Sequence, residues 1–575
     1  MRNLTEAEIA ALEHNGCVAD DWSNVKVSHS FDAAENRIRN VEFFGCVNLG
    51  CFDSDVEADG GAVRKSGIFN ASLENVTVGD NAYIRNVGII RSQKSARTAW
   101  GRKIAVLCES GDENVVLHPC LSAQEAAIMV QHSDEMQDYM AGIEEDGSHS
   151  LDDFARIGNN TVIINVKTIV NSNIGDETKI VNATRIEGCE ISGGAEIGDN
   201  VICRNSIVCR SASVQSGATV DSCFVGEAVE ISSYFSATNS LFFANSIMSN
   251  GEACAAFCGP FSVSHHRSSL LIGGMYSFYN AGSGTNYSNH AYKSGAVHYG
   301  FMRRGAKTAS GAHILLPAEI PPFTMVMGKV TNHPQLADFA FSYLIADADR
   351  LWLVPGINFA TLGTYRDVNK WKKRDGRIGN KGIDHIEYDF LHPYILQKVM
   401  RASAKLKEWE SACTGDVYAI DGKTNIRRSA ILKGIKYYDC VLKMGFGLYQ
   451  NIDRLKKDVC ASADSVEWAD VQGLFLPAEC VEAIAKTAKN PQEMKNLVNQ
   501  AKDESKAVAD SWMASAMARF YNVAKVDEKT TEMAKHDALE ARSKWIELIK
   551  EDAKKEAALG DIPPSALEAT LTSIK

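Results

Sequence analysis

The sequence lacks several features that would assign a function directly. It has no run of eighteen apolar residues, which argues against a transmembrane helix. Its formal charge is −12 and its pI is near 5.7, so it has no basic excess of the kind that nucleic-acid-binding proteins use. Its first residues turn acidic at once and form no apolar signal-peptide core. We therefore expect no nucleic-acid partner and no membrane partner.

Cysteine is abundant, but its spacing is not that of a metal or redox motif. None of the fifteen cysteines forms a Cys-x-x-Cys pair. Six of them lie in a repetitive middle region, namely Cys189, Cys203, Cys209, Cys223, Cys254 and Cys258. Because free cysteine behaves as a small buried hydrophobe, we expect stacked interior thiols there. Reduced thiols and the lack of an export signal favour a cytoplasmic protein.

The middle of the chain repeats every 17 residues. One register contains Ile157, Ile174, Ile191, Val208 and Val225. A second contains Ile163, Ile180, Ile197, Val214, Ile231 and Met248, and a third Ile169, Ile186, Cys203 and Val220. Within one repeat the aliphatic residues step by six, six and five, which predicts three short strands per coil with one inward side chain each. A helix would place apolar residues every three or four positions, so we predict a parallel β-helix.

The sequence changes character along its length, and we divide it into five parts. They are residues 1–91 (an N-terminal segment and the first β-helix coils), 92–150 (an insertion that interrupts or caps the solenoid), 151–333 (the main β-helix with the candidate site), 334–390 (a linker with a helix and a basic loop) and 391–575 (an α-helical region). In the first part, Val56, Leu73 and Ile90 keep the 17-residue spacing, and Val78, Ile84 and Ile90 step by six.

Helical patterns lie outside the repeat. We predict helices over Leu121–Tyr139, within the insertion, and over Pro334–Leu351, within the linker. The strongest start signal is at Asn490, where asparagine fits the N-cap, Pro491 the first turn and Glu493 the reciprocal capping position. A last long helix is expected from about Thr530 to Ala558.

Histidine and positive charge gather in one irregular segment, 259–328. It contains five of the fourteen histidines, namely His265, His266, His290, His298 and His313. It also contains the cations Arg267, Lys293, Arg303, Arg304 and Lys307. Local positive charge within an acidic chain suggests an anionic ligand such as a phosphate or a diphosphate. We expect no metal, because His265 and His266 would face opposite sides of a strand and no carboxylate lies close in sequence.

The same segment carries an ordered set of short motifs. They are Ser264-His265-His266, Ile272-Gly273, Gly282-Ser283-Gly284-Thr285, Asn286-Tyr287 and Lys293. This order resembles the acetyltransferase domain of the N-acetylglucosamine-1-phosphate uridyltransferase family, which has Asn-His, Ile-Gly, Gly-Ala-Gly-Thr, Asn-Tyr-Asp-Gly and a lysine. That family belongs to the left-handed β-helix, hexapeptide-repeat acyltransferases. As a whole, the chain also resembles a bacterial protein family of unknown function.

The resemblance implies a homotrimer that moves an acetyl-type group from acetyl-CoA, or a related acyl-CoA, to a sugar phosphate or nucleotide sugar. It implies His266 or His265 as the general base, with His290 as a further match to the Asn-His motif. Asn286 and Tyr287 would contact the acceptor and Lys293 a phosphate. We add Arg303 and Arg304 as phosphate-binding candidates from their charge and position alone.

The sequence also departs from that family. Ser288-Asn289 replaces the Asp-Gly that follows Asn-Tyr, and no Gly-rich phosphate loop precedes Ser66, so we disfavour nucleotidyl transfer. Two function classes stay open at this point. One is an acyltransferase, and the other is a non-catalytic scaffold that binds a sugar or a nucleotide sugar.

Overall fold

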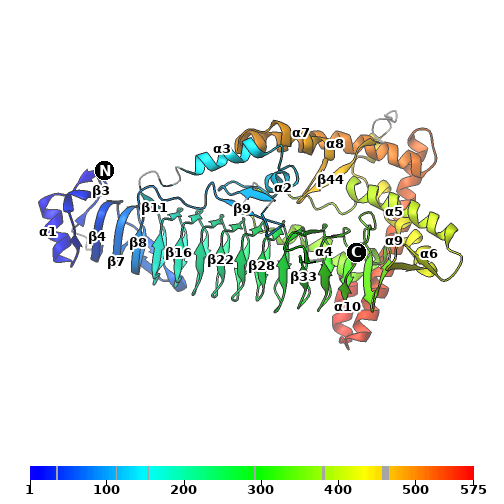
Figure 1. The fold of residues 1–575 in the computed structure, drawn as a ribbon, viewed down its shortest axis with the longest axis horizontal. Coiled ribbons are helices and arrows are strands. Elements are labelled where there is room, and N and C mark those ends of the chain that lie inside the picture. The colour runs from blue at the N-terminus through cyan, green and yellow to red at the C-terminus, as the bar shows by residue number, and fades with distance from the viewer. Residues whose placement is uncertain are drawn as a thin grey trace.

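A computed structural model describes residues 1–33, 37–111, 113–148, 151, 154–290, 293–378, 382–455 and 465–574. Short strands stack along the long axis of the molecule, and helices lie above this stack and around its C-terminal end (Figure 1). Thirty of the strands belong to one sheet. We refer to the stacked strands as the coil stack.

Each coil contributes up to three strands. The first strands are β11 (Ala155–Ile157), β14 (Asn173–Ile174), β17 (Glu190–Ile191), β20 (Ile207–Val208), β23 (Phe224–Val225), β26 (Leu241–Phe242), β29 (Phe257–Cys258), β32 (Gly274–Tyr276), β34 (Gly300–Met302) and β37 (Ala318–Ile320). The second strands are β12 (Val162–Ile164), β15 (Lys179–Val181), β18 (Glu196–Ile197), β21 (Ser213–Val214), β24 (Glu230–Ser232), β27 (Ile247–Ser249), β30 (Val263–Ser264), β35 (Lys307–Thr308) and β38 (Met325–Met327). The third strands are β13 (Thr168–Val170), β16 (Arg185–Glu187), β19 (Ile202–Arg204), β22 (Thr219–Asp221), β25 (Ser236–Thr238), β28 (Glu252–Cys254), β31 (Leu270–Ile272), β33 (Asn286–Ser288), β36 (His313–Leu315) and β39 (Lys329–Val330).

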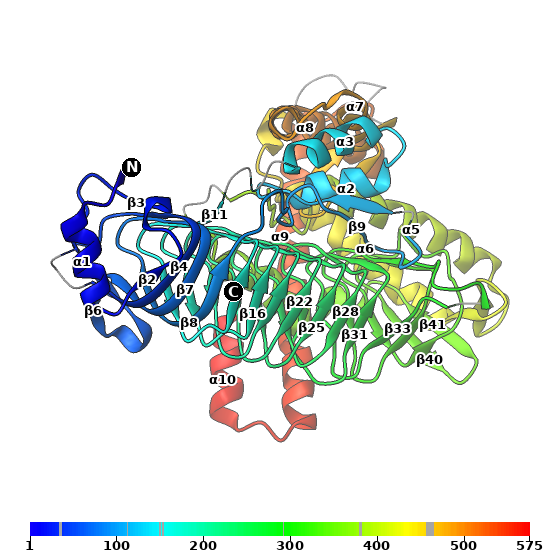
Figure 2. The same cartoon turned by 60° about the vertical axis from the view of Figure 1, so that its left-hand side comes forward.

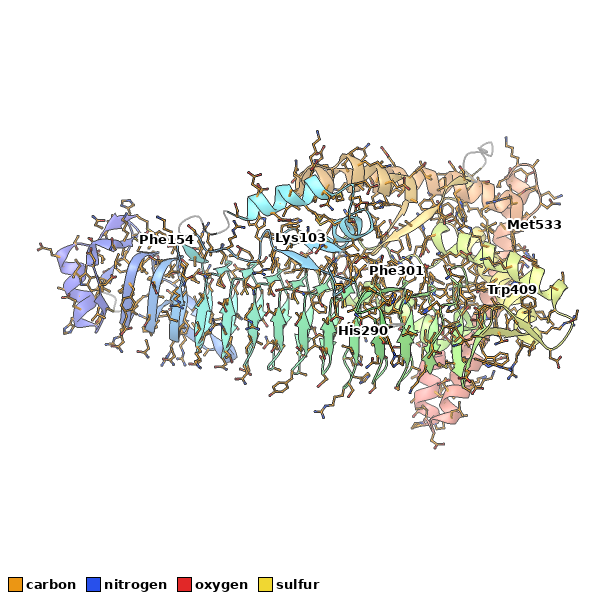
Figure 3. The ribbon with its side chains drawn as sticks, in the orientation of Figure 1. Lys103, Phe154, His290, Phe301, Trp409 and Met533 are labelled. Carbon is orange, nitrogen blue, oxygen red and sulfur yellow. The ribbon has the colours of Figure 1, made fainter. Side chains whose placement is uncertain are left out.

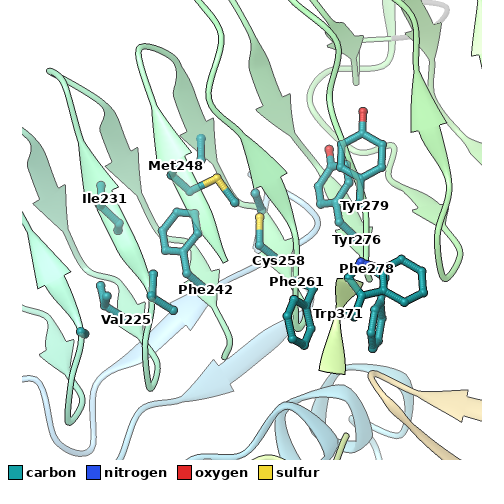
Figure 4. Packing of buried hydrophobic residues seen from close by; sticks show 14 of the residues in the cluster. Val225, Ile231, Phe242, Met248, Cys258, Phe261, Tyr276, Phe278, Tyr279 and Trp371 are labelled. Carbon is teal, nitrogen blue, oxygen red and sulfur yellow. The ribbon is translucent and has the colours of Figure 1, made fainter. Parts of the chain in front are cut away.

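The strand pairing confirms that residues 17 apart stack on one another. Ile157 pairs in parallel with Ile174, and Ile174 with Ile191. Every member of the three registers is buried, and each fully buried aliphatic side chain contributes about 1.5–3 kcal/mol. Figure 4 shows Ile231 and Met248 side by side inside adjacent coils. This large parallel sheet is consistent with the predicted β-helix.

Asparagines hold one corner of the coils together. Asn40, Asn70, Asn86, Asn165 and Asn182 adopt φ between 51° and 57°, a left-handed conformation that asparagine tolerates well. Their side-chain amides donate in sequence to the oxygen of the next coil's asparagine, at 2.9–3.1 Å. This ladder closes each sharp turn and joins it to its neighbour.

The insertion leaves the coil stack and returns to the same place. Val78 pairs with Ile157 and Ile84 with Ile163, although residues 92–154 lie between them in sequence. Within this stretch lie β9 (Lys103–Ala105), β10 (Asn114–Val116), α2 (Ala123–Gln131) and α3 (Gln137–Gly147). The helical pattern predicted from Leu121 is therefore confirmed, as two short helices.

The N-terminal coils use longer strands. The elements are β1 (Arg2–Asn3), α1 (Glu6–His14), β2 (Val18–Ala19), β3 (Val25–Val27), β4 (Ile38–Leu49), β5 (Asp55–Glu57), β6 (Val63–Lys65), β7 (Gly67–Val78) and β8 (Tyr83–Arg91). Leu73 pairs with Ile90 as the spacing predicted, but Val56 does not belong to a coil. It lies in the antiparallel hairpin β5–β6, so its 17-residue distance from Leu73 is a coincidence of hairpin length.

The predicted helix over Pro334–Leu351 is wrong. Turns lead instead into the antiparallel strands β40 (Tyr343–Asp347) and β41 (Arg350–Val354), and β40 continues the parallel ladder from β38. Leu336, Phe339 and Ala340 are buried, so their helix-like spacing reflects burial through turns at the end of the coil stack.

The C-terminal part contains helices and four further strands. They are α4 (Leu362–Lys370), α5 (Pro393–Ala412), β42 (Val417–Ala419), β43 (Thr424–Arg427), α6 (Arg428–Gly447), β44 (Trp468–Val471), β45 (Leu474–Pro477), α7 (Ala478–Thr487), α8 (Pro491–Phe520), α9 (Glu528–Leu559) and α10 (Pro564–Ser573). The Asn490 cap is confirmed, since its side chain accepts the backbone N–H of Glu493. The reciprocal bond differs from the prediction, because the Glu493 carboxylate accepts the backbone N–H of Lys489, one residue before Asn490. Among the described residues, no helix combines the length and apolar character needed to cross a membrane.

One outer face of the coil stack is covered by the chain itself. Its outward aromatic residues Phe224, Phe243 and Phe257 share a buried cluster with the insertion and with α7 and α8. Figures 1 and 2 both show α2, α3, α7 and α8 over this side of the stack. A ligand therefore reaches the coils from the sides that these elements leave uncovered.

Candidate functional site

A coil has three corners, and the predicted site residues are distributed over all of them. The first corner joins the first and second strands, the second corner joins the second and third, and the third corner leads to the next coil. Arg303 and Arg304 lie at the first corner, His265 and His266 at the second, and His290 and Lys293 at the third, while Asn286 and Tyr287 lie on a third strand. Closeness in sequence therefore does not bring these residues together.

The histidine pair sits on a lengthened second corner. Met248 pairs with Ser264, and Ala253 pairs with Leu271. The same corner therefore spans four residues in one coil and six in the next. Because His265 lies on this corner and not within a strand, its ring does not oppose that of His266. The two exposed rings have centroids 4.2 Å apart, which corrects the expectation that they face opposite ways.

A groove of about 490 Å³ runs across several coils beside this corner. Its floor is the outer side of successive third strands, where Ser236 pairs with Glu252 and Glu252 with Leu270. Its corner wall includes Tyr234, Asn250, Gly251 and Arg267, and the predicted residue Asn286 lines the adjoining coil. The groove thus combines an aromatic ring, a guanidinium, a carboxylate and amide groups.

Tyr234 is displayed to solvent by an unusual backbone. Both Ser233 and Tyr234 have positive φ, 55° and 59°, which is a sparsely populated conformation for a tyrosine. The ring lies against Gly217 of the preceding coil, where an added Cβ would come within 2.5 Å of the ring. Tyr234 is 77% exposed, so it offers an accessible aromatic surface to a ligand.

Positive charge flanks the histidine corner on both sides. Arg267 lines the groove, and the described part of the chain gives its guanidinium no ion pair. On the other side, Lys307 and Lys370 both pair with Asp367, which neutralises only one of the two charges. Partial burial, the neighbouring His266 and Lys370 all lower the pKa of His265. This lowered pKa favours the neutral form of His265, which a general base requires.

Tyr287 does not reach the groove. It is buried inside the coil, where its hydroxyl lies 2.7 Å from that of Tyr279, which also lies 2.9 Å from Thr308 Oγ1. The expectation that Tyr287 contacts an acceptor is corrected by this burial. Figure 4 shows Tyr276 and Tyr279 on the same interior side.

His290 and Lys293 lie at the opposite end of the third strand from the histidine pair. Both are exposed in a loop that follows β33 (Figure 3 labels His290). The loop is held by the insertion, because Asn289 Nδ2 donates to Glu109 and Ser110 Oγ to the Ala296 carbonyl. These contacts place the two predicted residues away from the groove.

The two predicted arginines have different environments. Arg304 is 1% exposed, pairs with Asp470 at 2.8 Å and lies between the rings of Phe278 and Phe475. Its role is to join the coil stack to the C-terminal region, so it is not available to a phosphate. Arg303 is partly exposed and pairs with Glu319 at 2.8 Å.

The described residues contain no group of three or more metal-ligating side chains that could hold an ion. Within the candidate site, the histidine pair therefore has no third ligand from the described chain.

Sequence reasoning missed several residues of the groove, among them Tyr234, Asn250, Glu252 and Ser268. The signal was present in the spacing, because Asn250 follows Tyr234 by 16 residues and Arg267 follows Asn250 by 17. Residues one coil apart stack, so polar or aromatic residues at this interval share one edge of the molecule. The grouping of histidines along the sequence was the less useful signal.

Of the comparisons with known proteins, the match to a family model is the informative one. A crystal structure of a "putative acetyltransferase" from Desulfovibrio desulfuricans G20 is 11% identical, with 59% of this chain and 80% of that chain covered and a TM-score of 0.16. So low a score carries no argument about fold or function. A comparison with curated proteins finds no match. The family model described as "Domain of unknown function (DUF4954)" matches residues 1–410, from the first strand to the helix α5. The chain therefore belongs to the DUF4954 family.

Proposed function

We propose that the groove binds a sugar phosphate or a nucleotide sugar, and that the protein transfers an acetyl-type group to it from acetyl-CoA or a related acyl-CoA. One observation carries the proposal: Tyr234, Arg267 and Asn286 line a single groove beside the His265–His266 corner. An aromatic face suits the apolar side of a sugar ring, a guanidinium suits a phosphate, and amides suit hydroxyl groups.

The chemistry needs one base near the acceptor. The acceptor amine or hydroxyl attacks the thioester carbonyl and gives its proton to a neutral imidazole. The carbon–sulfur bond then breaks, and CoA leaves as a thiolate that takes up a proton. His265 fits the base because its pKa is lowered, and His266 is its immediate neighbour. Ser268 also lines the groove, and its hydroxyl would stabilise the oxyanion.

Two further parts of the proposal rest on the sequence resemblance alone. They are the left-handed winding of a hexapeptide-repeat enzyme and assembly as a homotrimer. Cations at Lys307 and Lys370, on the other side of the histidine corner, would suit the phosphates of CoA. A mass measurement in solution tests the trimer independently of activity.

A non-catalytic binding scaffold is the second candidate. It is favoured by the burial of Tyr287 and by the position of Lys293 at the third corner, because neither residue of the family-like pattern reaches the groove. The groove itself is compatible with binding in either case.

The decisive experiment measures binding and transfer in one series. Calorimetry with acetyl-CoA and with glucosamine 1-phosphate is followed by a mass-spectrometric assay for the acetylated sugar. We expect binding of both, and a loss of turnover of about 10²–10⁴-fold in the double variant His265→Ala/His266→Ala with sugar binding retained. His290→Ala is the matched control and should leave both unchanged. Sugar binding without any transfer would support the scaffold, and no binding of either compound would end the proposal.

A further inference from the structure

A second, more enclosed cavity lies between the insertion and α8. Its volume is about 330 Å³. Three stretches that are far apart in sequence supply its walls, namely residues 100–146, 383–385 and 491–498. It lies over the covered face of the coil stack, where Figure 1 shows α2 and α3 near α8. It is separate from the groove described above, since the two share no lining residue.

The walls of this cavity are fixed by buried hydrogen bonds. The Asp384 carboxylate accepts the backbone N–H of Ala123 at 2.7 Å and that of Ala244 at 3.0 Å. The Gln124 side chain donates to the carbonyls of His385 and Gln472, both at 3.0 Å. The insertion, the coil stack and the C-terminal region are thus tied together around the cavity, which is therefore preformed.

A buried polar relay lines the cavity. His118 Nε2 lies 2.7 Å from Glu125 Oε1, and the Tyr139 hydroxyl donates to the same oxygen at 2.5 Å. The side chains of His118 and Glu125 are each only 4% exposed. Burial and the Glu125 charge raise the pKa of Tyr139, so its hydroxyl keeps its proton. With Glu125 accepting both bonds, His118 donates from Nε2, and Nδ1 is its remaining ring nitrogen.

His118 Nδ1 has no partner within the described chain. The Nε2 atom is the one bonded to Glu125. The Nδ1 atom retains some accessible surface. Because His118 is 3% exposed and lines the cavity, the accessible space at Nδ1 is the cavity itself. A ring nitrogen that is free of protein partners and faces a cavity is available to a ligand hydroxyl.

The rest of the lining is mainly apolar. Ile143, Met494 and Val498 are buried, and Trp100 and Ile383 complete an apolar surface around the relay. Ser122, Asp146, His385, Gln492 and Lys495 also line the cavity, and a mainly apolar lining with a few polar groups is typical of small-molecule sites. The ligand that fits such a site has an apolar body and one hydroxyl group.

We propose that this cavity is a second binding site, for a small alcohol or phenol whose hydroxyl forms a hydrogen bond with His118 Nδ1. The apolar body of the ligand packs against Ile143, Met494 and Val498. Binding here does not depend on acyl transfer at the groove, because the two sites lie on different sides of the coil stack.

The test compares two probes that differ in a single hydroxyl, 4-methylphenol and toluene. Calorimetry on the full chain should give about tenfold tighter binding for 4-methylphenol, the contribution of one hydrogen bond. Occupancy is localised by alkylation, because Cys120 is exposed and lines the cavity. Bound 4-methylphenol should protect Cys120 from iodoacetamide, read by peptide mass spectrometry, while Cys46 of β4 reacts as before.

Two variants complete the test. His118→Phe should abolish the difference between the probes. Val498→Trp fills the cavity and leaves the His118–Glu125 bond in place, so it should abolish binding of both probes even if His118→Phe does not fold. Equal binding of the two probes, no binding of 4-methylphenol up to its solubility limit, or protection of Cys46 together with Cys120 would overturn the proposal.

Discussion

The regular coils from Ile157 to Met248 and the coils that follow them differ in their corners. In the regular part the repeat is constant, and the corner Asn165 donates to Asn182 of the next coil at 2.9 Å. After Met248 the distance between paired residues changes to 16, 18 and then 26. Interior stacking needs a constant register, whereas a corner can lengthen into solvent. The comparison shows that the same fold keeps its inward positions fixed and varies its corners to build a site.

The interiors of the two regions differ as well. In the regular coils, aliphatic side chains stack beside buried serines such as Ser172 and Ser206, whose hydroxyls bond to backbone groups, whereas in the later coils the buried hydroxyls bond to one another. Thr285 Oγ1 lies 2.7 Å from Thr308 Oγ1, which lies 2.9 Å from the Tyr279 hydroxyl. The later coils also depend on the C-terminal region, through Arg304 and Asp470. The later coils therefore depend more than the regular coils on polar interactions and on contacts between residues that are distant in sequence.

The largest expected effect is at the junction between the later coils and the C-terminal region. Arg304→Ala leaves Asp470 buried without its partner and should lower the free energy of unfolding by about 3–5 kcal/mol. The neighbouring Arg303→Ala breaks a partly exposed pair and should cost less than about 1 kcal/mol. Urea denaturation of both variants measures the difference. Equal losses would mean that the later coils do not rely on the buried pair.

In the regular coils, Ile197→Ala should cost about 2–5 kcal/mol, because Ile197 is buried between Ile180 and Val214. The groove lies on other coils, so the affinity for glucosamine 1-phosphate should not change. Denaturation and calorimetry on the same variant test both statements. A loss of affinity in this folded variant would show that the two regions are coupled and would weaken the comparison.

The converse change is Tyr234→Ala, at the exposed edge of the groove. Since Tyr234 is mostly solvated, we expect a change in stability within about 0.5 kcal/mol. Binding of glucosamine 1-phosphate should weaken about tenfold, through loss of the aromatic surface. Tyr234→Phe keeps the ring and should bind like the unchanged protein. If Tyr234→Ala binds as tightly, the ligand does not use this wall.

The inward registers could be predicted from sequence because a buried position permits few residue types, and 17-residue spacing survives in every regular coil. The spacing failed at Val56, where a hairpin of suitable length imitates a coil. It also could not reveal that Arg304 meets Asp470, because that pair joins residues 166 apart through a segment with no repeat. Whether a charge is buried depends on which distant segment of the chain packs over it, and the neighbouring sequence does not show that.

The candidate site was predicted only in part for a related reason. His265, His266 and Asn286 could be predicted because they carry chemistry and match a motif. Tyr234 and Asn250 were missed, because their only signal is their spacing along the repeat, and the coil length changes at this point. A solvent-facing corner accepts many residue types. The residues at such a corner can therefore be recognised in the sequence only by their distance along the repeat.

The smallest expected effect concerns the charge beside the histidine corner. Lys370→Met removes one of the charges that lower the pKa of His265, so this pKa should rise toward its usual value. Asp367 keeps its pair with Lys307, so the local structure should hold. Nuclear magnetic resonance titration of the imidazole follows the pKa directly, and Lys486→Met on α7 is a control with the same loss of charge. Under the proposed acyl transfer, the acid limb of the kcat/KM profile should move to higher pH in Lys370→Met, because protonation of the base stops turnover. An unchanged pKa would mean that burial and His266 alone set the state of His265, and that the C-terminal region does not tune the corner.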